Sequence, residues 1–583
     1  MNTGLANPPQ LVPYMDLGGG LNTRKDPHAL ARNELATSIN LWPAYDQAVA
    51  KRPGSIAIGT SGTGKPCKSL LSCRFNGITY LLEVKTDGNV FAGLAAGALP
   101  FTKIGKVNPA ALFVTSAQMT DPYQKIGVVP GVQSVFICDG MSTPQLWNGP
   151  GTQMQNVFTG TDPKLGAGIP TKDPQGNHPI TPQFVTTLGN NSHLFYSGDP
   201  DEPSAVYVSD PFYPEFFNSP AMQVNPTKAN NPGQYIPAII GNNDGVEGGK
   251  INGMETLGSA MIVFKECAIY QMIATTLLGE IPTWQVVTVS NNRGCLSPRS
   301  ICAFDTFIVF LALDGIYATD GNTIWLISYD VPTFFDSTLT GQAALITNRT
   351  NAIGVRHATR YLTWFLAQSA PNTTGLWFDF SKQTASGMPL CGQIEGMNVG
   401  GATALTGEQD DGNVAWSDSI IDTIGKFGIG YSDLGPNNTQ VNIAVTMAGK
   451  ADLLDDVFGP DSVIGEKQAQ TYYALVELLG APAGSQIALE FKGAVLVNNQ
   501  ILLPQAVAQQ ISQGLSPVGI WGASVWGAFQ WGAAAQYGFQ VIKCPNQNSA
   551  RGNLLQFVLT ESSQIPWILI GYALYANYQL PGY

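Results

Sequence analysis

The chain has 583 residues, 44% of them hydrophobic and only 12% charged, and it carries 64 glycines and 39 prolines. The length predicts two to four domains, since a typical domain has roughly 150 residues. The apolar content excludes a disordered chain, and the absence of Glu/Lys/Leu-rich heptads excludes a coiled coil. A net charge of −12 without any Lys/Arg cluster also argues against tight binding of nucleic acid.

Residues 1–60 contain few strand signals. Asp26-Pro27, followed by apolar residues between Ala29 and Ala36, predicts one capped helix with proline at its first position. A Gly-rich start and one short helix offer little core, so we expect residues 1–60 to be a segment that docks onto neighbours. The start also lacks the charged and apolar regions of a signal peptide, and no apolar run approaches 18 residues. We therefore expect a soluble protein, made in a cytoplasm, without a membrane anchor.

Short strands joined by tight turns follow from about residue 70 to residue 430. Residues 78–84 meet residues 90–92 across Thr86-Asp-Gly-Asn89, which is a strong hairpin signal. Asp139-Gly140 and Asp320-Gly321 mark further turns of this kind. Recurring hairpins without helical periodicity predict an irregular β-propeller over residues 61–435, with five to seven blades. A stack of β-sandwiches is the competing interpretation.

The last part of the chain, residues 436–583, predicts an antiparallel β-sandwich-like or jelly-roll-like domain. Its clearest strand candidates are residues 472–479, 555–560 and 567–572. Between them, three Trp-Gly pairs recur at five-residue intervals, which fits neither strand alternation nor a helix face: Trp521, Trp526 and Trp531. Such pairs favour a core or a subunit interface, where glycine lets another backbone approach. A sugar-stacking surface is the alternative.

Gly59-Thr-Ser-Gly-Thr-Gly-Lys65-Pro66 matches a phosphate-binding loop up to its last position. That mechanism needs a Ser or Thr hydroxyl on Mg²⁺ at the last position, where a helix begins. Pro66 has no hydroxyl and disfavours a helical conformation at Lys65. We therefore expect a flexible Gly/Ser/Thr-rich loop rather than a nucleotide site.

The sequence offers no pattern for catalysis or for a cofactor. There is no GxSxG motif and no Cys/His spacing of a zinc site, and the only histidines are His28, His178, His193 and His357. The acidic groups near Asp199, Asp244 and Asp452 do not match a calcium loop, so they favour solvated turns over a cation site. We expect no catalytic residue, no metal and no cofactor.

Two segments of the chain resemble a known family. Asp16-Leu-Gly-Gly-Gly-Leu-Asn-Thr-Arg24, followed by Asn40 and by Lys51-Arg52-Pro53-Gly54, is similar to the opening of tail nozzle proteins (tail tubular protein B-like) of short-tailed bacteriophages. The run from Ile251 to Tyr270 and the Trp-Gly run before the last strands are also similar. The likeness spans most of the chain, on loose patterns rather than an invariant site.

The resemblance implies a structural virion protein of the phage tail that is not an enzyme. A nozzle is a homo-oligomeric ring, commonly a hexamer, below the portal and the head-to-tail adaptor. Its implied partners are the adaptor, tail fibre or spike proteins, and needle or tip proteins, and genomic double-stranded DNA leaves through its channel without sequence-specific binding. As interface residues of such a ring we select Asp16, Asn22, Arg24, Arg52, Trp521, Trp526 and Trp531.

Two other functions are compatible with the sequence. One is a receptor-binding or glycan-binding propeller of a phage tail, which would need clustered exposed aromatics and carboxylates. The other is a tail-tip or baseplate hub of a long-tailed phage.

Overall fold

The chain is mostly β, as the sequence predicts. The computed structural model describes residues 10–14, 16–44, 48–97, 101–120, 133–157, 180–188, 193–201, 203–209, 234–236, 249–275, 283–336, 349–365, 374–405, 413–435, 438–453, 467–478, 486–491, 495–497, 500–502, 507–512, 539–545, 554–562, 564 and 567–578. Over these ranges there is no α-helix, and the two helical elements are the 3₁₀ turns η4 (Pro298–Ser300) and η5 (Pro332–Phe334).

Seven antiparallel sets of four strands follow one another along most of the described chain, and we call them sheets 1 to 7. Sheet 1 contains β6 (Cys67–Phe75), β7 (Ile78–Lys85), β8 (Asn89–Leu94) and β9 (Thr102–Lys106). Sheet 2 contains β10 (Thr115–Thr120), β11 (Gln133–Cys138), β12 (Gln145–Trp147) and β13 (Gln155–Asn156). Sheet 3 contains β14 (Phe184–Leu188), β15 (His193–Ser197), β16 (Val206–Val208) and β17 (Gln234–Ile236). Sheet 4 contains β18 (Ile251–Leu257), β19 (Ala260–Lys265), β20 (Ile269–Thr275) and β21 (Thr283–Ser290). Sheet 5 contains β22 (Cys302–Ala303), β23 (Ile308–Leu311), β24 (Ile316–Thr319) and β25 (Ile324–Leu326). Sheet 6 contains β26 (Ala352–His357), β27 (Arg360–Phe365), β28 (Thr374–Gln383) and β29 (Pro389–Ile394). Sheet 7 contains β30 (Val399–Ala404), β31 (Val414–Asp418), β32 (Ile424–Phe427) and β5 (Ser55–Gly59).

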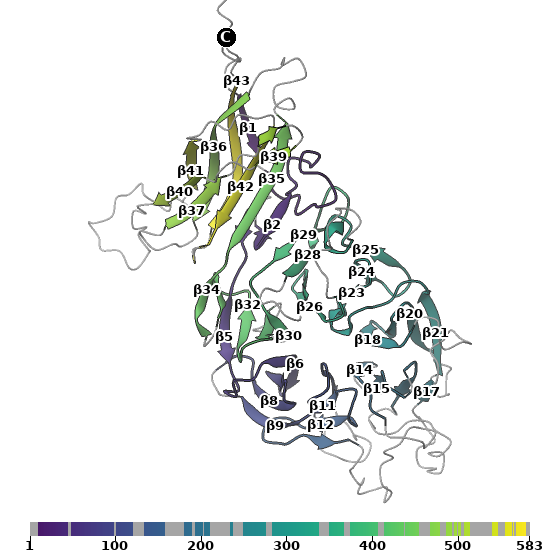
Figure 1. The fold of residues 1–583 in the computed structure, drawn as a ribbon. Coiled ribbons are helices and arrows are strands. Elements are labelled where there is room, and N and C mark those ends of the chain that lie inside the picture. The colour runs from purple at the N-terminus through teal and green to yellow at the C-terminus, as the bar shows by residue number, and fades with distance from the viewer. Residues whose placement is uncertain are drawn as a thin grey trace, which may run out of the picture.

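The seven sheets are arranged in a ring (Figure 1). Their first strands contact one another in cyclic order, from β6 through β10, β14, β18, β22 and β26 to β30 and back to β6. Each pair of consecutive sheets shares one apolar cluster, so the sheets pack face to face. Trp147 of sheet 2, for example, packs edge to face against Phe75 of sheet 1, with 5.0 Å between ring centroids, and burial of one such side chain contributes roughly 1.5–3 kcal/mol.

Sheet 7 closes the ring with a strand from the start of the chain. β5 pairs antiparallel with β32 and forms the edge of sheet 7, and the chain then enters β6 of sheet 1. Gly400 and Gly401 of β30 lie directly against β6, where an added Cβ would approach Cys67 O to 2.3 Å and Leu70 N to 2.5 Å. Only glycine permits this close approach of two strands.

The hairpins expected from Asp-Gly turns are confirmed. β7 pairs with β8, β11 with β12, and β24 with β25. The glycines Gly88, Gly140 and Gly321 have φ values of 85°, 75° and 86° at their turns, a backbone region that glycine adopts at no steric cost.

A second group of sheets contains strands from both ends of the chain. Sheet 6 continues from β29 through β2 (Thr37–Ile39) and β35 (Val445–Leu453) to β42 (Leu554–Glu561). A second large sheet has the strand order β3 (Leu41–Pro43), β4 (Val49–Lys51), β43 (Trp567–Tyr578), β36 (Lys467–Leu478) and β41 (Phe539–Pro545). In it, β1 (Gln10–Tyr14) also pairs with β43. Two-stranded sheets are β33 (Ser432–Leu434) with β34 (Gln440–Asn442), β37 (Gln486–Phe491) with β40 (Val507–Ser512), and β38 (Val495–Val497) with β39 (Gln500–Leu502). Phe557 of β42 stacks on Tyr572 of β43 at 4.1 Å between ring centroids, so the two large sheets face each other.

The strands of residues 10–59 are therefore shared between the ring and the second group of sheets. β2 lies between β29 and β35, whereas β1 and β4 extend the sheet of β43. The helix expected from Asp26 is wrong, because this stretch forms turns and an isolated bridge between Leu21 and Leu35. Contacts of Leu30, Glu34 and Leu35, which are all buried, override the local helix signal.

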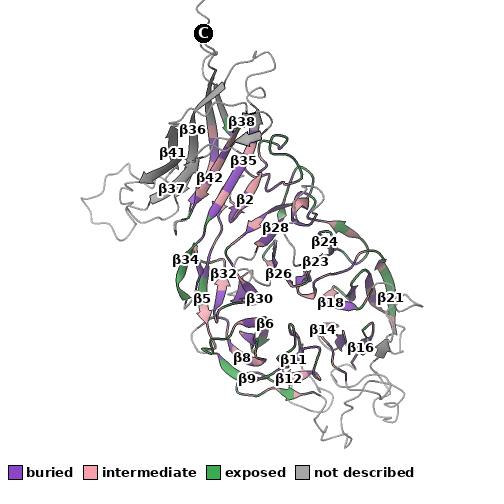
Figure 2. Ribbon diagram, viewed as in Figure 1, coloured by how far each residue is buried: buried purple, intermediate pink, exposed green. Residues whose placement is uncertain are grey.

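Buried residues follow the sheets throughout the described part of the ring, and exposed residues gather on outer strands such as β9 and β34 (Figure 2). No helix in the described part of the chain is long and apolar enough to cross a membrane.

Candidate functional site

Arg52, at the start of the Arg-Pro-Gly turn, is fully buried between the ring and the second group of sheets. Its guanidinium forms a two-pronged ion pair with Asp433, in which Nη1 donates to Oδ1 at 3.0 Å and Nη2 donates to Oδ2. Nε donates to Asn40 Oδ1 at 2.8 Å, and Nη2 also donates to the carbonyl of Glu395 at 3.1 Å. One side chain thus holds segments that lie hundreds of residues apart in sequence.

Asn40 and Gly54 complete this junction around Arg52. Asn40 has a φ of 57° and donates from Nδ2 to the carbonyl of Ala444 at 2.7 Å. A Cβ on Gly54 would lie 2.1 Å from the carbonyl oxygen of Ser432, so no larger residue fits there. We call Asn40, Arg52, Gly54 and Asp433 the junction cluster.

A second buried ion pair lies one residue before Arg52. Lys51 Nζ donates to Glu561 Oε2 at 3.0 Å, and both side chains are inaccessible to solvent. The indole Nε1 of Trp567 donates to the same oxygen at 2.9 Å. Burial lowers the pKa of Lys51, and the charge of Glu561 opposes that shift. This pair joins β4 to β42 and β43.

The Gly-rich start is held by its own polar contacts. The Oδ1 of Asn22 accepts from the backbone N–H of Arg24 at 3.0 Å, and its Nδ2 donates to Glu34 Oε1 at 2.9 Å. Asp16 accepts from the N–H of Gly18 at 2.8 Å. The Arg24 guanidinium lies over the ring of Tyr329, 3.8 Å from its centroid. Tyr329 belongs to the segment between η4 and η5.

The selected interface residues fall into three groups. Arg52 and Asn22 are buried inside the chain, where they hold its segments together and leave no surface for a neighbouring copy. Asp16 is partly exposed and Arg24 exposed, so their contact with another chain stays a prediction. Trp521, Trp526 and Trp531 lie outside the described residues.

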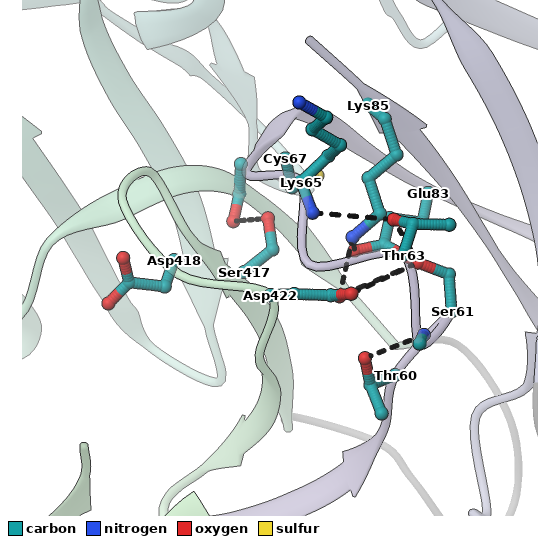
Figure 3. A network of polar contacts seen from close by, with 12 residues as sticks. Thr60, Ser61, Thr63, Lys65, Cys67, Glu83, Lys85, Ser417, Asp418 and Asp422 are labelled. Carbon is teal, nitrogen blue, oxygen red and sulfur yellow. Dashed lines mark hydrogen bonds and ion pairs between the residues drawn. The ribbon is translucent and has the colours of Figure 1, made fainter. Parts of the chain in front are cut away.

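The Gly/Ser/Thr-rich loop resembling a phosphate-binding loop donates a hydrogen bond to a carboxylate of the chain itself (Figure 3). The N–H of Gly64 donates to Asp422 Oδ2 at 2.8 Å, and Asp422 lies in the turn between β31 and β32. Lys85 of sheet 1 donates to Asp422 Oδ1 at 2.6 Å and also pairs with Glu83. Sheet 1, sheet 7 and their connecting loop thus meet at one network, which we call the closure network.

Burial shapes the ionisation of the closure network. It raises the pKa of Glu83 to about 7, although the neighbouring Lys85 opposes the shift. Burial likewise raises the pKa of Cys67 to about 12, which keeps this thiol protonated and unreactive at neutral pH. The network is therefore suited to holding two sheets together rather than to nucleophilic chemistry.

The innermost strands of the ring line a cavity of about 440 Å³ that is partly open to solvent, which we call the central cavity. Residues of six sheets line it, together with Arg299 of η4. Glu255 of β18 also lines it. Sequence reasoning missed both charged residues, because neither lies in a recognisable motif. Over the residues that the structure describes, no three His, Cys, Asp or Glu side chains gather as metal ligands would.

No protein-family model and no curated protein matches the chain. Among solved structures, Raptor of Chaetomium thermophilum has a TM-score of 0.36 and 8% identity, with 65% of this chain and 29% of that chain covered. The computationally designed protein Ika8 has a TM-score of 0.30 and 10% identity, covering 64% of this chain and all of Ika8. PorZ, a surface component of the type-IX secretion system of Porphyromonas gingivalis, has a TM-score of 0.30 and 10% identity, covering 65% and 38%.

The chain thus spans less than a third of the length of Raptor. Similarities at these TM-scores and identities assign neither a fold nor a function to this chain.

Proposed function

We propose that the chain is a subunit of the tail nozzle ring of a short-tailed bacteriophage, built as a seven-bladed β-propeller joined to a β-sandwich. The seven consecutive four-stranded sheets, the cyclic contacts of their first strands and the shared apolar clusters support the propeller. The facing sheets of β42 and β43 support the sandwich.

One observation carries the nozzle proposal. Asn40 and the Arg52-Pro53-Gly54 turn, which belong to the resemblance to nozzle proteins, meet the rest of the chain at the junction between the ring and the second group of sheets. Asn40 and Arg52 are hydrogen-bonded to each other there, and Arg52 forms an ion pair with Asp433, which follows the last strand of the ring in the sequence. The residues behind the resemblance therefore fix one part of the subunit against the other, as a ring that holds its shape during DNA ejection requires.

The DNA channel would lie between copies of the chain and not through its own ring of sheets. The central cavity, at about 440 Å³, has the size of a small-molecule site, whereas the major groove of duplex DNA alone is about 12 Å wide and the duplex is wider still. Several chains must therefore surround the DNA together. A closed ring of identical subunits arises when one head-to-tail interface repeats by rotation.

The charge of the chain suits such a conduit. Phosphate contacts from Lys and Arg strengthen DNA binding and would oppose sliding. A chain with a net charge of −12 presents the opposite field, and copies in a ring add to it. We expect a neutral to acidic channel face without readout of bases.

Labelled virions test this proposal. Antibody fragments raised against the recombinant chain should bind in a ring at the tail, below the portal and adaptor, when particles are imaged by electron microscopy. Label at the tips of tail fibres would instead favour the receptor-binding function. Label on a distal hub of a long tail would favour the baseplate function.

A further inference from the structure

We infer that the central cavity is a binding site for a small hydroxylated organic anion, with a sugar acid such as a uronic acid as the fitting class. The inference concerns the interior of one chain and is independent of the nozzle proposal. The volume of the central cavity, about 440 Å³, falls in the range of small-molecule sites, roughly 300–1,000 Å³.

Arg299 supplies the positive charge of the central cavity. Its Nη1 donates to the carbonyls of Lys68 at 2.8 Å and of Gly400 at 2.9 Å, so the side chain is anchored to sheet 1 and sheet 7. Nε and Nη2 have no partner among the described residues, and Arg299 forms no ion pair there. An anchored guanidinium with unused donors on a cavity wall suits a carboxylate, since its planar fork matches that group.

Glu255 is the second charged residue on the cavity wall. Its Oε1 accepts from the N–H of Thr256 at 3.0 Å, and its Oε2 has no partner among the described residues. Burial raises the pKa of Glu255, which favours the neutral carboxyl. A neutral carboxyl both donates and accepts hydrogen bonds, and hydroxyl groups of a ligand can use both.

Burial also acts on Arg299, yet without neutralising it. It lowers the pKa of the guanidinium to about 10, so the residue stays charged at neutral pH. Arg299 thus gives the cavity wall a positive charge that an anion can pair with, whereas burial disfavours the negative charge of Glu255 through its raised pKa.

Hydroxyl side chains from five sheets line the rest of the cavity: Ser69, Thr115, Thr186, Thr256 and Thr403. Four of the five already form internal bonds. Ser69 Oγ accepts from the N–H of Val114 at 2.9 Å, and the hydroxyls of Thr115, Thr256 and Thr403 donate to Gln183 O, Glu255 Oε1 and Ser72 Oγ at 2.7, 3.4 and 3.0 Å. A hydroxyl has one donor and two acceptor positions, so a bonded one can still accept from a ligand. This wall fits a polyhydroxylated ligand better than an apolar one.

Calorimetric titration of the purified full-length chain tests the inference, with D-glucuronate as the probe and D-glucose and acetate as controls. Glucuronate should bind saturably, with a Kd on the order of 1 mM. Glucose, which lacks the charge, and acetate, which lacks the hydroxyls, should each bind about tenfold or more weakly. Equal binding of glucose and glucuronate, or no saturation by glucuronate at about 50 mM, would overturn the inference.

Variants assign the binding to the central cavity. Arg299→Gln should weaken glucuronate binding by about tenfold or more, because a charge-assisted bond is lost. The same change at exposed Arg74, which does not line the central cavity, should leave glucuronate binding unchanged, and Glu255→Gln should retain it. Unchanged affinity in a folded Arg299→Gln variant would contradict the site.

Hydrogen exchange of the unmodified protein gives a second measurement that does not depend on the folding of a variant. Glucuronate should protect residues 251–257 and 298–301, which carry Glu255 and Arg299, relative to the outer strands β9 and β13. Protection confined to any other region would overturn the assignment.

Discussion

Arg52 and Asp433 form a buried two-pronged ion pair, although 381 positions separate them in the sequence. Arg52 precedes the first strand of the ring and Asp433 follows the last complete sheet, so the pair ties the two ends of the ring sequence together. All three guanidinium nitrogens of Arg52 donate hydrogen bonds to oxygens of the chain.

Removing one partner of this pair should cost much of the stability. Arg52→Met leaves Asp433 buried and unpaired, so we expect the free energy of unfolding to fall by about 3–5 kcal/mol. Arg74→Met, at an exposed position, should change it by less than about 0.5 kcal/mol. Denaturant titration followed by fluorescence measures both, and equal effects of the two variants would contradict the role of the pair.

The closure network predicts a local as well as a global effect. Lys85→Met should lower the free energy of unfolding by about 3 kcal/mol, because Asp422 loses a buried cation. Hydrogen exchange should rise in residues 55–66 and 418–427, where sheet 7 meets sheet 1, before it rises in sheet 3. Lys65→Met in the same loop, at an exposed position, is the matched control and should leave exchange unchanged.

Glu83 predicts a pH dependence of the same network. Its pKa is raised from 4.5 to about 7 in the folded chain, so the folded state binds the proton more tightly than the unfolded state. Its contribution to stability is complete below pH 4.5 and declines as the pH rises through 7, by about 3 kcal/mol in total. Glu83→Gln should remove this decline, measured as the difference between the two proteins across pH 4.5–8. Parallel pH profiles would contradict the assignment.

The acidic character of the chain predicts weak DNA binding. The assembled protein should bind duplex DNA no more tightly than about 10⁻⁶ M at physiological salt, with no preference among sequences. A gel-shift assay with two unrelated duplexes measures this. Tight, sequence-dependent retention would contradict the conduit and favour a DNA-processing role.

The local part of the fold could be predicted from the sequence. Asp-Gly and Asn-containing turns between apolar runs announce hairpins within a few residues, and Gly88, Gly140 and Gly321 adopt the turn conformations they predict. The failed helix after Asp26 shows the limit of such signals. Glu34, which would lie in that helix, is instead drawn to Lys25 and Asn22 by tertiary contacts.

The sites depended on contacts that no local pattern announces. Arg52 looked like a surface interface residue, because its partner Asp433 lies in an unremarkable turn of another sheet. Glu255 and Arg299 line one cavity only because the sheets are arranged in a ring. Pro66 argues against a nucleotide site in the Gly59–Lys65 loop from the sequence alone, whereas the hydrogen bond that Gly64 N–H donates to Asp422 is visible only in the structure.

Electron cryomicroscopy of intact virions that contain this chain is the most direct measurement of the proposed function. We expect a closed ring of copies below the portal and adaptor, with duplex density between the copies and none inside the seven-sheet ring of any copy. Isolated copies at fibre tips, or a tail channel built without this chain, would contradict the account.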